Sequence, residues 1–349
     1  MEPDYSRQIA LKEIGAAGQA LLERSRVLVV GAGGLGSPVL QYLAGAGVGS
    51  LTVIDHDTLD PSNLHRQPLY ALEDAGRPKA ALAAAALAKL NPRVRVEDRA
   101  ERFGPANALD LVAGHDLVVE CSDNFRTKFL VNDAAVLAAR PVVFASAYQY
   151  EGQLQVYKPD REHACLRCLW PEAAADGVVG NCAQAGVLGP VPGALGAMQA
   201  VLALELLLGI GTQLRGEVLL IDFLEFTTLK LRAPRHHACD APRCCRVRAI
   251  EPEDPGLEVT LESLDEAAAR GWTVVDVRSA EEVVVRPAAG RHCPVAQLLA
   301  AETPLAREVE YLLVCATGTR SLAAARTLRR RGYSVRSLAG GLARFDRGR

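Results

Sequence analysis

The sequence lacks an excess of charge of either sign. Its 39 lysines and arginines nearly balance 41 aspartates and glutamates, which gives a formal net charge of −2. Proteins that bind nucleic acid through its phosphates usually carry a basic domain or a basic patch. The charge balance therefore gives no support to nucleic-acid binding, and we expect no nucleic-acid partner.

Long hydrophobic runs are also missing. The first ten residues, MEPDYSRQIA, are polar and contain no apolar signal core. The most apolar segment, Val201–Ile210, is too short to cross a bilayer and carries Glu205. We expect this segment to be a buried helix, and the protein to be soluble, cytoplasmic and without a membrane partner.

The domain organisation follows from length and local composition. A chain of 349 residues suggests two domains. The stretch RVRAIEPEDPGLEVT has many charges, two prolines and no clear period, so residues 246–259 are predicted to be a linker. It separates residues 1–245 from residues 260–349, and we detect no internal repeat. Strand and helix patterns alternate in both parts, which predicts two α/β domains.

A glycine-rich turn opens the first domain. The segment SRVLVVGAGGLGSPVLQYLAGAGVGSLTVIDHD predicts a strand, a turn, a helix and a second strand. Gly31, Gly33 and Gly36 fit the pattern G-x-G-x-x-G, and Asp55 ends the second strand. Glycines let the backbone approach phosphates, and an acidic residue can accept ribose hydroxyls. The pattern predicts nucleotide binding, and glycines that merely pack helix on strand are the less favoured interpretation.

Charged residues further along the chain favour phosphoryl chemistry over hydride transfer. Arg66, Lys79 and Asp123 lie in predicted loops or at their ends. Hydride transfer to NAD has no evident use for two cations and a carboxylate of this kind. In phosphoryl chemistry, cations offset charge on phosphate oxygens and an aspartate holds Mg²⁺. Any one of these residues alone would more simply be a solvated surface charge, so the prediction depends on the set.

Eight motifs in one order carry a family resemblance across residues 4–245. They are YSRQI, GAGGLGSP, YLAGAGVG, SNLHRQ, GRPK, SDN, CLRC and NCAQAGVLGP. Together they resemble the MoeB/ThiF family of ubiquitin-activating-like adenylyltransferases. The resemblance implies a Rossmann-like domain that binds ATP and Mg²⁺. It also implies a homodimer that adenylates the C-terminal Gly-Gly carboxylate of a ubiquitin-like sulfur carrier protein.

The resemblance implies roles for the matching residues. Gly34 would lie against the phosphates and Asp55 would hold the ribose. The phosphate contacts would come from Ser62, Asn63, Arg66 and Lys79. Asp123 would take Mg²⁺ with Asn124 beside it, and Arg7 would reach into the partner subunit's site. No general base is required because the attacking carboxylate is ionised at neutral pH, and His56 and His65 receive no role.

Nine cysteines in a protein expected to be cytoplasmic point to metal binding or catalysis before disulfides. Cys165 and Cys168 form CLRC, which suits zinc or redox chemistry. A second group, HHACDAPRCCR, departs from the family's second C-x-x-C but still allows tetrahedral zinc. The predicted structural Zn²⁺ ligands are Cys165, Cys168, Cys239 and Cys244. Cys245, His236 and His237 are alternatives for the fourth ligand, and a site that has lost its metal is the less favoured interpretation.

The other cysteines of the first domain are less informative. Cys182, in GNCAQAG, matches a family cysteine on a loop above the adenylate. The resemblance implies a thioester or a disulfide there during sulfur transfer. No base or cation is visible near it in the sequence, so an incidental thiol is the alternative. We expect Cys121, and Cys293 of the second domain, to be ordinary buried thiols.

The second domain carries a cysteine of a different kind. In VCATGTRS, Cys315 follows a strand-like run and precedes a helix-like stretch, so backbone N–H groups, a helix N-terminus and Arg320 favour a thiolate. With Asp276 and Arg278, and the final SLAGG, the segment 260–346 resembles a rhodanese. The resemblance implies that Cys315 carries a persulfide, stabilised by Arg320 and the loop amides. The altered stretch AAGRHCPVAQL leaves a degenerate, partner-docking domain as the alternative.

The two halves together predict an adenylyltransferase and sulfurtransferase. The first domain would make an acyl-adenylate, and the Cys315 persulfide would replace AMP to give a thiocarboxylate. The sulfur donor would be thiosulfate or a persulfidated desulfurase, and the sequence does not identify the carrier. The alternatives are an enzyme that adenylates another peptide C-terminus beside a vestigial rhodanese, a NAD-dependent oxidoreductase, and a non-catalytic scaffold for ubiquitin-like proteins.

Overall fold

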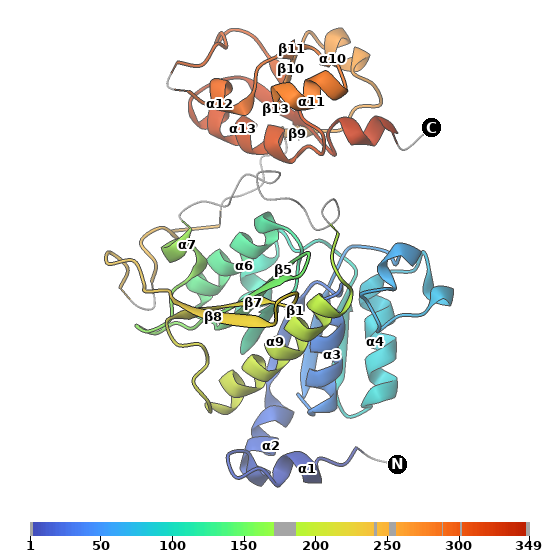
Figure 1. The fold of residues 1–349 in the computed structure, drawn as a ribbon, viewed down its shortest axis with the longest axis vertical. Coiled ribbons are helices and arrows are strands. Elements are labelled where there is room, and N and C mark those ends of the chain that lie inside the picture. The colour runs from blue at the N-terminus through green and yellow to red at the C-terminus, as the bar shows by residue number, and fades with distance from the viewer. Residues whose placement is uncertain are drawn as a thin grey trace. The chain divides into compact units, whose positions relative to one another are not determined.

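The computed structural model describes residues 3–170, 186–240, 243–250, 256–287, 289–300 and 302–346. The described residues up to 250 form one compact unit and those from 256 onward form a second. Each unit is built on its own sheet, flanked by helices (Figure 1). This confirms the predicted α/β fold class. The linker predicted at 246–259 includes residues outside the described ranges, and its bounds stay a prediction.

The first unit contains an eight-stranded sheet in the order β3-β2-β1-β4-β5-β6-β7-β8. The first five strands in this order are parallel and the last three pairings are antiparallel. The strands are β1 (Arg26–Val30), β2 (Ser50–Ile54), β3 (Arg95–Arg99), β4 (Leu117–Glu120), β5 (Val142–Tyr148), β6 (Glu151–Tyr157), β7 (Glu217–Asp222) and β8 (Thr227–Arg232).

Helices cover both faces of the parallel part because its strands are apolar on both sides. In β1, Val27 and Val29 belong to one apolar cluster, and Leu28 and Val30 belong to another. The first cluster contains residues of α3 (Gly36–Gly45), α4 (Lys79–Leu90) and α9 (Pro190–Leu208); the second contains residues of α5 (Ala108–Ala113) and α6 (Phe125–Ala138). The described part of the unit also contains the helices α1 (Ser6–Ile9), α2 (Gly15–Arg24) and α7 (Leu166–Leu169), with 3-10 turns at Pro61–Asn63 and Leu72–Asp74.

The strand order reverses between β1 and β4. The chain proceeds outward from β1 to β2 and β3, then returns to add β4 on the other side of β1. In open α/β sheets the loops diverge at such a point and leave a crevice at the carboxyl ends of the strands. The glycine turn after β1 and the SDN segment after β4 both lie at this edge.

Helix α9 contains most of the apolar segment predicted to be a buried helix. By length and composition it is the one described helix that could cross a membrane, and 44% of its most apolar window is buried. It packs against α3, β5 and β6, and Leu195 and Ala203 are fully buried. Val201 is 56% exposed, so α9 is a core helix with one uncovered face. The expected cytoplasmic location stays a prediction.

The second unit has a five-stranded parallel sheet in the order β11-β10-β12-β13-β9. Its strands are β9 (Glu258–Val259), β10 (Thr273–Asp276), β11 (Arg291–His292), β12 (Tyr311–Val314) and β13 (Val335–Leu338). Its helices are α10 (Asp265–Ala269), α11 (Ala280–Val285), α12 (Val295–Leu298) and α13 (Thr319–Arg330), with a final 3-10 turn at Leu342–Asp346. The central strand β12 reads YLLV and is buried throughout, because helices cover both sides of it. It carries Cys315 at its carboxyl end.

Candidate functional site

The glycine turn between β1 and α3 needs glycine at its first and last positions. Gly31 has φ +98°, and a Cβ there would lie 2.8 Å from the Cys121 carbonyl oxygen. A Cβ on Gly36 would lie 2.1 Å from the Gly31 carbonyl oxygen. A Cβ on Gly33 would lie 3.5 Å from the Gln67 side chain, and one on Gly34 would lie 3.2 Å from the Pro192 side chain. The outer glycines therefore fold the turn. Gly33 leaves room beside the turn, whereas the Cβ position of Gly34 faces Pro192 of α9 and the Arg66 carbonyl.

Asp55 braces the glycine turn from the end of β2. Its Oδ2 accepts a hydrogen bond from the Ala32 N–H at 2.7 Å, and its Oδ1 accepts one from the Asp57 N–H at 2.8 Å. Burial raises the pKa of Asp55, although these two hydrogen bonds oppose the rise. The carboxylate is thus fixed beside the turn and keeps lone pairs for ribose hydroxyls, as its predicted role requires.

The segment SNLHRQ forms a tight turn beside the glycine loop. Its start is held by Asp60, whose Oδ1 accepts the Ser62 N–H at 2.8 Å, while the Asn63 side chain accepts the Asp60 N–H at 3.4 Å. Arg66 is half-buried and donates to the Ser62 carbonyl at 3.2 Å. The Arg66 carbonyl lies 3.3 Å from the Cβ position of Gly34. The structure therefore brings the Arg66 backbone and the Gln67 side chain against the glycine turn, and Ser62 and Asn63 belong to the same segment.

Lys79 is a buried cation at the start of α4. The residue is 5% exposed, and its Nζ lies 3.1 Å from the Asp57 carboxylate. The Asp57 side chain is 55% exposed, so the partner of this buried ammonium is a solvated carboxylate. A lysine is rarely buried without a strong partner. Sequence reasoning missed Asp57; its position two residues after Asp55 was the available signal.

Asp123 and Asn124 occupy the turn between β4 and α6, at the carboxyl edge of β4. Asp123 is exposed, as a residue that binds Mg²⁺ from solvent would be. Asn124 is the N-cap of α6, because its Oδ1 accepts the Thr127 N–H at 2.8 Å. Its side-chain oxygen therefore serves the helix in this structure, which is a local role beyond the one the resemblance implies.

A buried polar network lies under the Asp123 turn, and sequence reasoning missed it. Glu120 is fully buried at the end of β4, accepts the Ser122 N–H at 2.8 Å and pairs with the Lys128 ammonium. Lys128 also donates to the Ala145 carbonyl at 2.7 Å. Gln199 of α9 donates to the Glu120 carbonyl at 2.8 Å. A charged residue closing the apolar strand LVVE was the available signal, since a buried carboxylate needs a partner.

Arg7 lies at the opposite end of α3 from the glycine turn. Its neighbours contact the carboxyl end of that helix: the Tyr5 hydroxyl accepts from Asn91, and Gln8 donates to the Ala46 carbonyl at 3.1 Å. Asn91 itself donates to the Ala44 carbonyl. The ten residues of α3 span about 15 Å. Arg7 therefore does not lie beside the nucleotide residues of its own protomer.

The cysteines predicted to bind zinc come together although more than sixty residues of chain separate the two pairs. The Sγ–Sγ distances are 3.7 Å for Cys165–Cys168, 3.9 Å for Cys168–Cys239 and 3.5 Å for Cys239–Cys244. The ligand atoms of Cys165, Cys168 and Cys244 all lie within 4.8 Å of one another. A tetrahedral zinc ion with Zn–S bonds of about 2.3 Å spaces its sulfurs about 3.8 Å apart. Cys165, Cys168 and Cys244 lie close enough together to share such an ion, and Cys239 lies 3.5–3.9 Å from two of them. We call these four residues the four-cysteine site.

The remaining cysteines of the first unit differ in their exposure to solvent. Cys121 is buried, as expected, and burial raises the pKa of its thiol. Cys245, an alternative zinc ligand, is exposed beside Cys239. Cys182 lies outside the described residues, so its role stays a prediction.

In the second unit, Cys315 begins the loop between β12 and α13. It is fully buried, and its Sγ accepts a hydrogen bond from the Ser321 hydroxyl at 3.5 Å. Gly318 has φ +90°, and a Cβ there would lie 2.9 Å from the backbone nitrogen of Gly341. A Cβ on Gly341 would in turn lie 2.5 Å from the Cys315 carbonyl oxygen. The SLAGG segment therefore packs directly against the cysteine loop, and its glycine permits the close approach.

Arg320 does not point alone into the cysteine loop. Its guanidinium makes a two-pronged ion pair with Glu282 of α11, with one N–O distance of 2.6 Å. The hydrogen bonds from Arg320 lower the pKa of Glu282 to about 2, and the carboxylate raises the pKa of Arg320. Sequence analysis predicts that Arg320 stabilises an anion on Cys315, and the Cys315 side chain does contribute to raising the Arg320 pKa. Glu282 is a second partner of Arg320 that the sequence did not predict.

Asp276 and Arg278 form a clamp rather than a reactive pair. Both are buried, and the Arg278 Nη2 lies 2.7 Å from the Asp276 Oδ2. Burial opposes ionisation of Asp276, but hydrogen bonds from Arg278 and from the Ala289 N–H outweigh it and lower its pKa. Arg278 also donates to the Arg286 and Pro287 carbonyls. The clamp fixes the end of α11 beside the cysteine loop.

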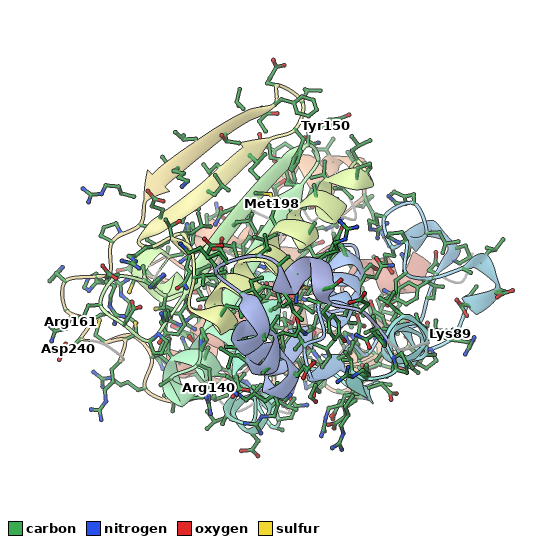
Figure 2. The ribbon with its side chains drawn as sticks, turned by 90° about the horizontal axis from the view of Figure 1, so that it is seen from below. Lys89, Arg140, Tyr150, Arg161, Met198 and Asp240 are labelled. Carbon is green, nitrogen blue, oxygen red and sulfur yellow. The ribbon has the colours of Figure 1, made fainter. Side chains whose placement is uncertain are left out.

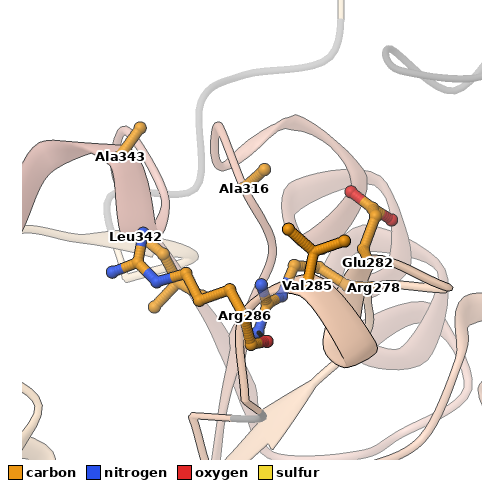
Figure 3. Close-up of a pocket in the computed structure, with 7 residues that line it drawn as sticks. All are labelled: Arg278, Glu282, Val285, Arg286, Ala316, Leu342 and Ala343. Carbon is orange, nitrogen blue, oxygen red and sulfur yellow. Dashed lines mark hydrogen bonds between the residues drawn. The ribbon is translucent and has the colours of Figure 1, made fainter. Parts of the chain in front are cut away.

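A pocket of about 320 Å³ opens next to this loop (Figure 3). Ala316 lies on one side of it and the Glu282 carboxylate on another. The remaining lining residues are Arg278, Val285, Arg286, Leu342 and Ala343. The pocket is mixed in character, with small apolar groups near the loop and charged groups around them, so it can admit a narrow polar chain or a small anion.

The comparisons with known proteins agree with this division into a nucleotide-binding unit and a thiol-bearing unit. Residues 5–242 match the ThiF family and residues 260–347 match the rhodanese-like domain. The chain belongs to the ThiF family and carries a rhodanese-like domain after it.

Three relatives illustrate the extent of the similarity. The sulfur carrier protein adenylyltransferase of Thermus thermophilus is 49% identical over 239 residues, which cover 67% of this chain and 88% of that protein. The probable adenylyltransferase/sulfurtransferase MoeZ of Mycobacterium tuberculosis is 36% identical over 347 residues, or 95% of this chain and 88% of that protein. The crystal structure of Escherichia coli MccB with MccA-N7isoASN has a TM-score of 0.61 at 24% identity, covers 68% of this chain and 74% of that one, and indicates the fold alone.

Proposed function

We propose that this protein adenylates the C-terminal carboxylate of a ubiquitin-like sulfur carrier protein and then replaces AMP with sulfur from Cys315. The observation that carries the proposal is the gathering of the glycine turn, Asp55, Arg66 and Lys79 at one sheet edge, in a chain that also holds a cysteine loop of the rhodanese kind. Relatives named adenylyltransferase and sulfurtransferase that match along nearly the whole chain support it.

In the adenylation step, an oxygen of the carrier carboxylate attacks the α-phosphorus of ATP and pyrophosphate leaves. Asp55 holds the ribose, and Ser62, Asn63 and the glycine turn receive the phosphates. Arg66 and Lys79 offset negative charge on the phosphate oxygens as it shifts toward pyrophosphate. Asp123 would hold Mg²⁺, which supplies further charge neutralisation when bound. The buried Lys79 is suited to this because an ammonium out of water interacts more strongly with an anion.

In the transfer step, the terminal sulfur of a Cys315 persulfide attacks the acyl-adenylate carbonyl carbon and AMP leaves. The product is an acyl disulfide between the carrier and Cys315. A thiol reductant then cleaves its S–S bond, which releases the carrier as a thiocarboxylate. The sulfur donor that renews the persulfide is thiosulfate or a persulfidated desulfurase. Holding both steps on one chain raises the effective concentration of sulfur near an intermediate that water hydrolyses.

The four-cysteine site would hold a structural Zn²⁺. Four thiolates close the coordination sphere, so the ion would tie the segment after β8 to α7 and take no part in the reaction. The protein is further proposed to act as a homodimer. Arg7 lies too far from its own glycine turn to serve it, and α3 and α9, which pack together, expose Tyr42 and Val201. A second copy would cover that face and receive Arg7.

The test uses the intact mass of a Gly-Gly carrier encoded near this gene. The carrier is incubated with enzyme, ATP, Mg²⁺, thiosulfate and a thiol. We expect one oxygen to be replaced by sulfur, dependent on ATP. The variant Cys315→Ala should still form the carrier–AMP adduct but no thiocarboxylate, and Cys293→Ala, a buried thiol elsewhere in the same unit, is the matched control. Loss of both products in Cys315→Ala would show that adenylation also depends on Cys315, which would contradict the assignment of the two steps to separate units.

A further inference from the structure

A second group of metal-binding side chains lies beside the four-cysteine site and shares one member with it. His236, Cys239 and Cys245 each offer one ligand atom, and the three atoms lie within 4.8 Å of one another. The Cys245 Sγ lies 3.2 Å from the Cys239 Sγ and 3.8 Å from the His236 Nδ1. The four-cysteine site needs neither Cys245 nor His236, so the proposed function leaves both unexplained.

The geometry of this group is close to that of a zinc site. With Zn–S bonds of about 2.3 Å and Zn–N bonds of about 2.0 Å, tetrahedral zinc spaces two sulfurs about 3.8 Å apart and a sulfur and a nitrogen about 3.5 Å apart. The observed distances of 3.2 Å and 3.8 Å differ from these by about 0.6 Å or less. Small side-chain rotations therefore suffice to bring all three atoms to bonding distance of one ion.

The two groups differ in their access to solvent. Cys165 and Cys244 of the four-cysteine site are buried, whereas Cys245 is exposed. The neighbouring Asp240 pairs with Arg161 on the surface, where both side chains are almost fully exposed (Figure 2). His236 and Cys239 are partly buried and Cys245 is exposed, so three protein ligands leave a fourth position for water on the solvent side. That arrangement is typical of exchangeable metal sites, whereas four protein ligands are typical of closed structural ones.

Charge gives a reason for a second cation. One Zn²⁺ with four thiolates carries a net charge of about −2, and a fifth thiolate beside it makes about −3. A second divalent ion held by Cys239, Cys245 and His236 brings the total to about −1 and screens two thiolates that lie side by side. The Cys245 N–H already donates to the Cys239 Sγ at 3.3 Å, which supports a shared, electron-rich sulfur.

We propose that His236, Cys239 and Cys245 bind a second soft divalent cation of the Zn²⁺ type, with Cys239 bridging it to the ion of the four-cysteine site. The second ion is bound more weakly and exchanges faster than the first, because it has three protein ligands and an open side.

The test is a Co²⁺ titration of the full chain, followed by the absorption bands of thiolate-bound cobalt. We expect a first equivalent that binds tightly and a second that binds more weakly and adds further thiolate absorption. Cys245→Ser should lose the second equivalent and keep the first, and His236→Asn should weaken the second only. Cys293→Ser, which changes a buried thiol of the other unit, should keep both. Retention of the first equivalent shows that each variant has folded around its four-cysteine site.

Two outcomes would overturn the proposal. If the wild type and Cys245→Ser both bind a single equivalent with the same spectrum, Cys245 and His236 are bystanders. The second outcome is that the wild type binds one equivalent, that Cys244→Ser still binds it, and that Cys244→Ser/Cys245→Ser does not. In that case Cys245 is an alternative ligand of a single metal site. The metal count and spectrum decide between these results without any measurement of catalysis, so failure here is separable from failure of the proposed function.

Discussion

The two units hold their functional cations in opposite ways. In the nucleotide unit, Lys79 is buried and its partner Asp57 is half in solvent, so an incoming phosphate can replace that partner at small cost. In the rhodanese-like unit, Arg320 is locked by both carboxylate oxygens of Glu282, and Cys315 is fully buried. In the first site the partner of the buried cation is accessible to solvent. In the second site Arg320 serves Glu282 and the Cys315 thiol together, since both raise its pKa, so Glu282 shares this cation with any anion formed on sulfur.

The difference arises from how each site is assembled. The nucleotide edge gathers the ends of β1, β2 and β4 with the SNLHRQ turn, so its shape depends on the whole sheet. The sulfur site is one loop, closed by the SLAGG glycines and by Arg320. A site assembled from distant segments can stay open without losing its shape, whereas a single loop needs local contacts to hold it. Three variants test this comparison.

The largest effect is expected from Lys79→Ala. Removing the buried ammonium should lower ATP–pyrophosphate exchange by about 10²- to 10³-fold, because a preorganised charge near the phosphates is lost. Lys89→Ala is the matched control, since Lys89 is exposed in the last turn of the same helix (Figure 2). It should leave the exchange rate unchanged. Equal rates for Lys79→Ala and the wild type would remove Lys79 from the site.

A smaller effect, about 10- to 100-fold, is expected when the network under Asp123 is neutralised. Lys128→Met alone would leave Glu120 buried without a cationic partner, at a cost of about 3–5 kcal/mol in the free energy of unfolding. The double variant Glu120→Gln/Lys128→Met avoids that unpaired charge. If the pair positions Asp123, the double variant should need more Mg²⁺ for half-maximal exchange.

The control for that variant is Lys128→Arg, which keeps the ion pair and should keep most of the activity. A purely structural role for the pair would lower the melting temperature without changing the Mg²⁺ dependence. That result would contradict the positioning role of Glu120 and Lys128.

Motifs predicted more of the nucleotide site than of the sulfur site. Gly31, Gly36 and Asp55 could be placed because a strand–turn–helix pattern fixes its own geometry. The partners Asp57, Glu120 and Glu282 could not, since each is an ordinary acidic residue in the sequence and gains its meaning from burial or from a distant cation. The spacing of Cys239, Cys244 and Cys245 left the fourth zinc ligand open. Packing places Cys244 with Cys165 and Cys168 and leaves Cys245 at the surface.

The smallest effect is expected from Glu282→Gln. Whether this variant uses thiosulfate faster or more slowly than the wild type bears most directly on the comparison between Lys79 and Arg320. If Glu282 competes with sulfur anions for Arg320, the variant should use thiosulfate about 2- to 5-fold better, which is the size of one partly exposed ion pair. Glu281→Gln, on the same helix and exposed, is the matched control. A slower Glu282→Gln enzyme would mean that Glu282 holds Arg320 in its working position.

The pH dependence of stability measures the Glu282–Arg320 ion pair independently of its effect on sulfur transfer. The pKa of Glu282 is lowered from 4.5 to about 2. A lowered carboxylate pKa stabilises the fold above the unfolded-state pKa, and that contribution is lost as pH falls from about 4.5 toward 2. The wild type should therefore exceed Glu282→Gln in stability by about 1 kcal/mol or less at neutral pH, and the gap should close in acid. A gap that stays constant down to pH 2 would assign the stability to packing. A gap that closes in acid would show that Glu282 draws on the charge of Arg320, which the Cys315 thiol shares.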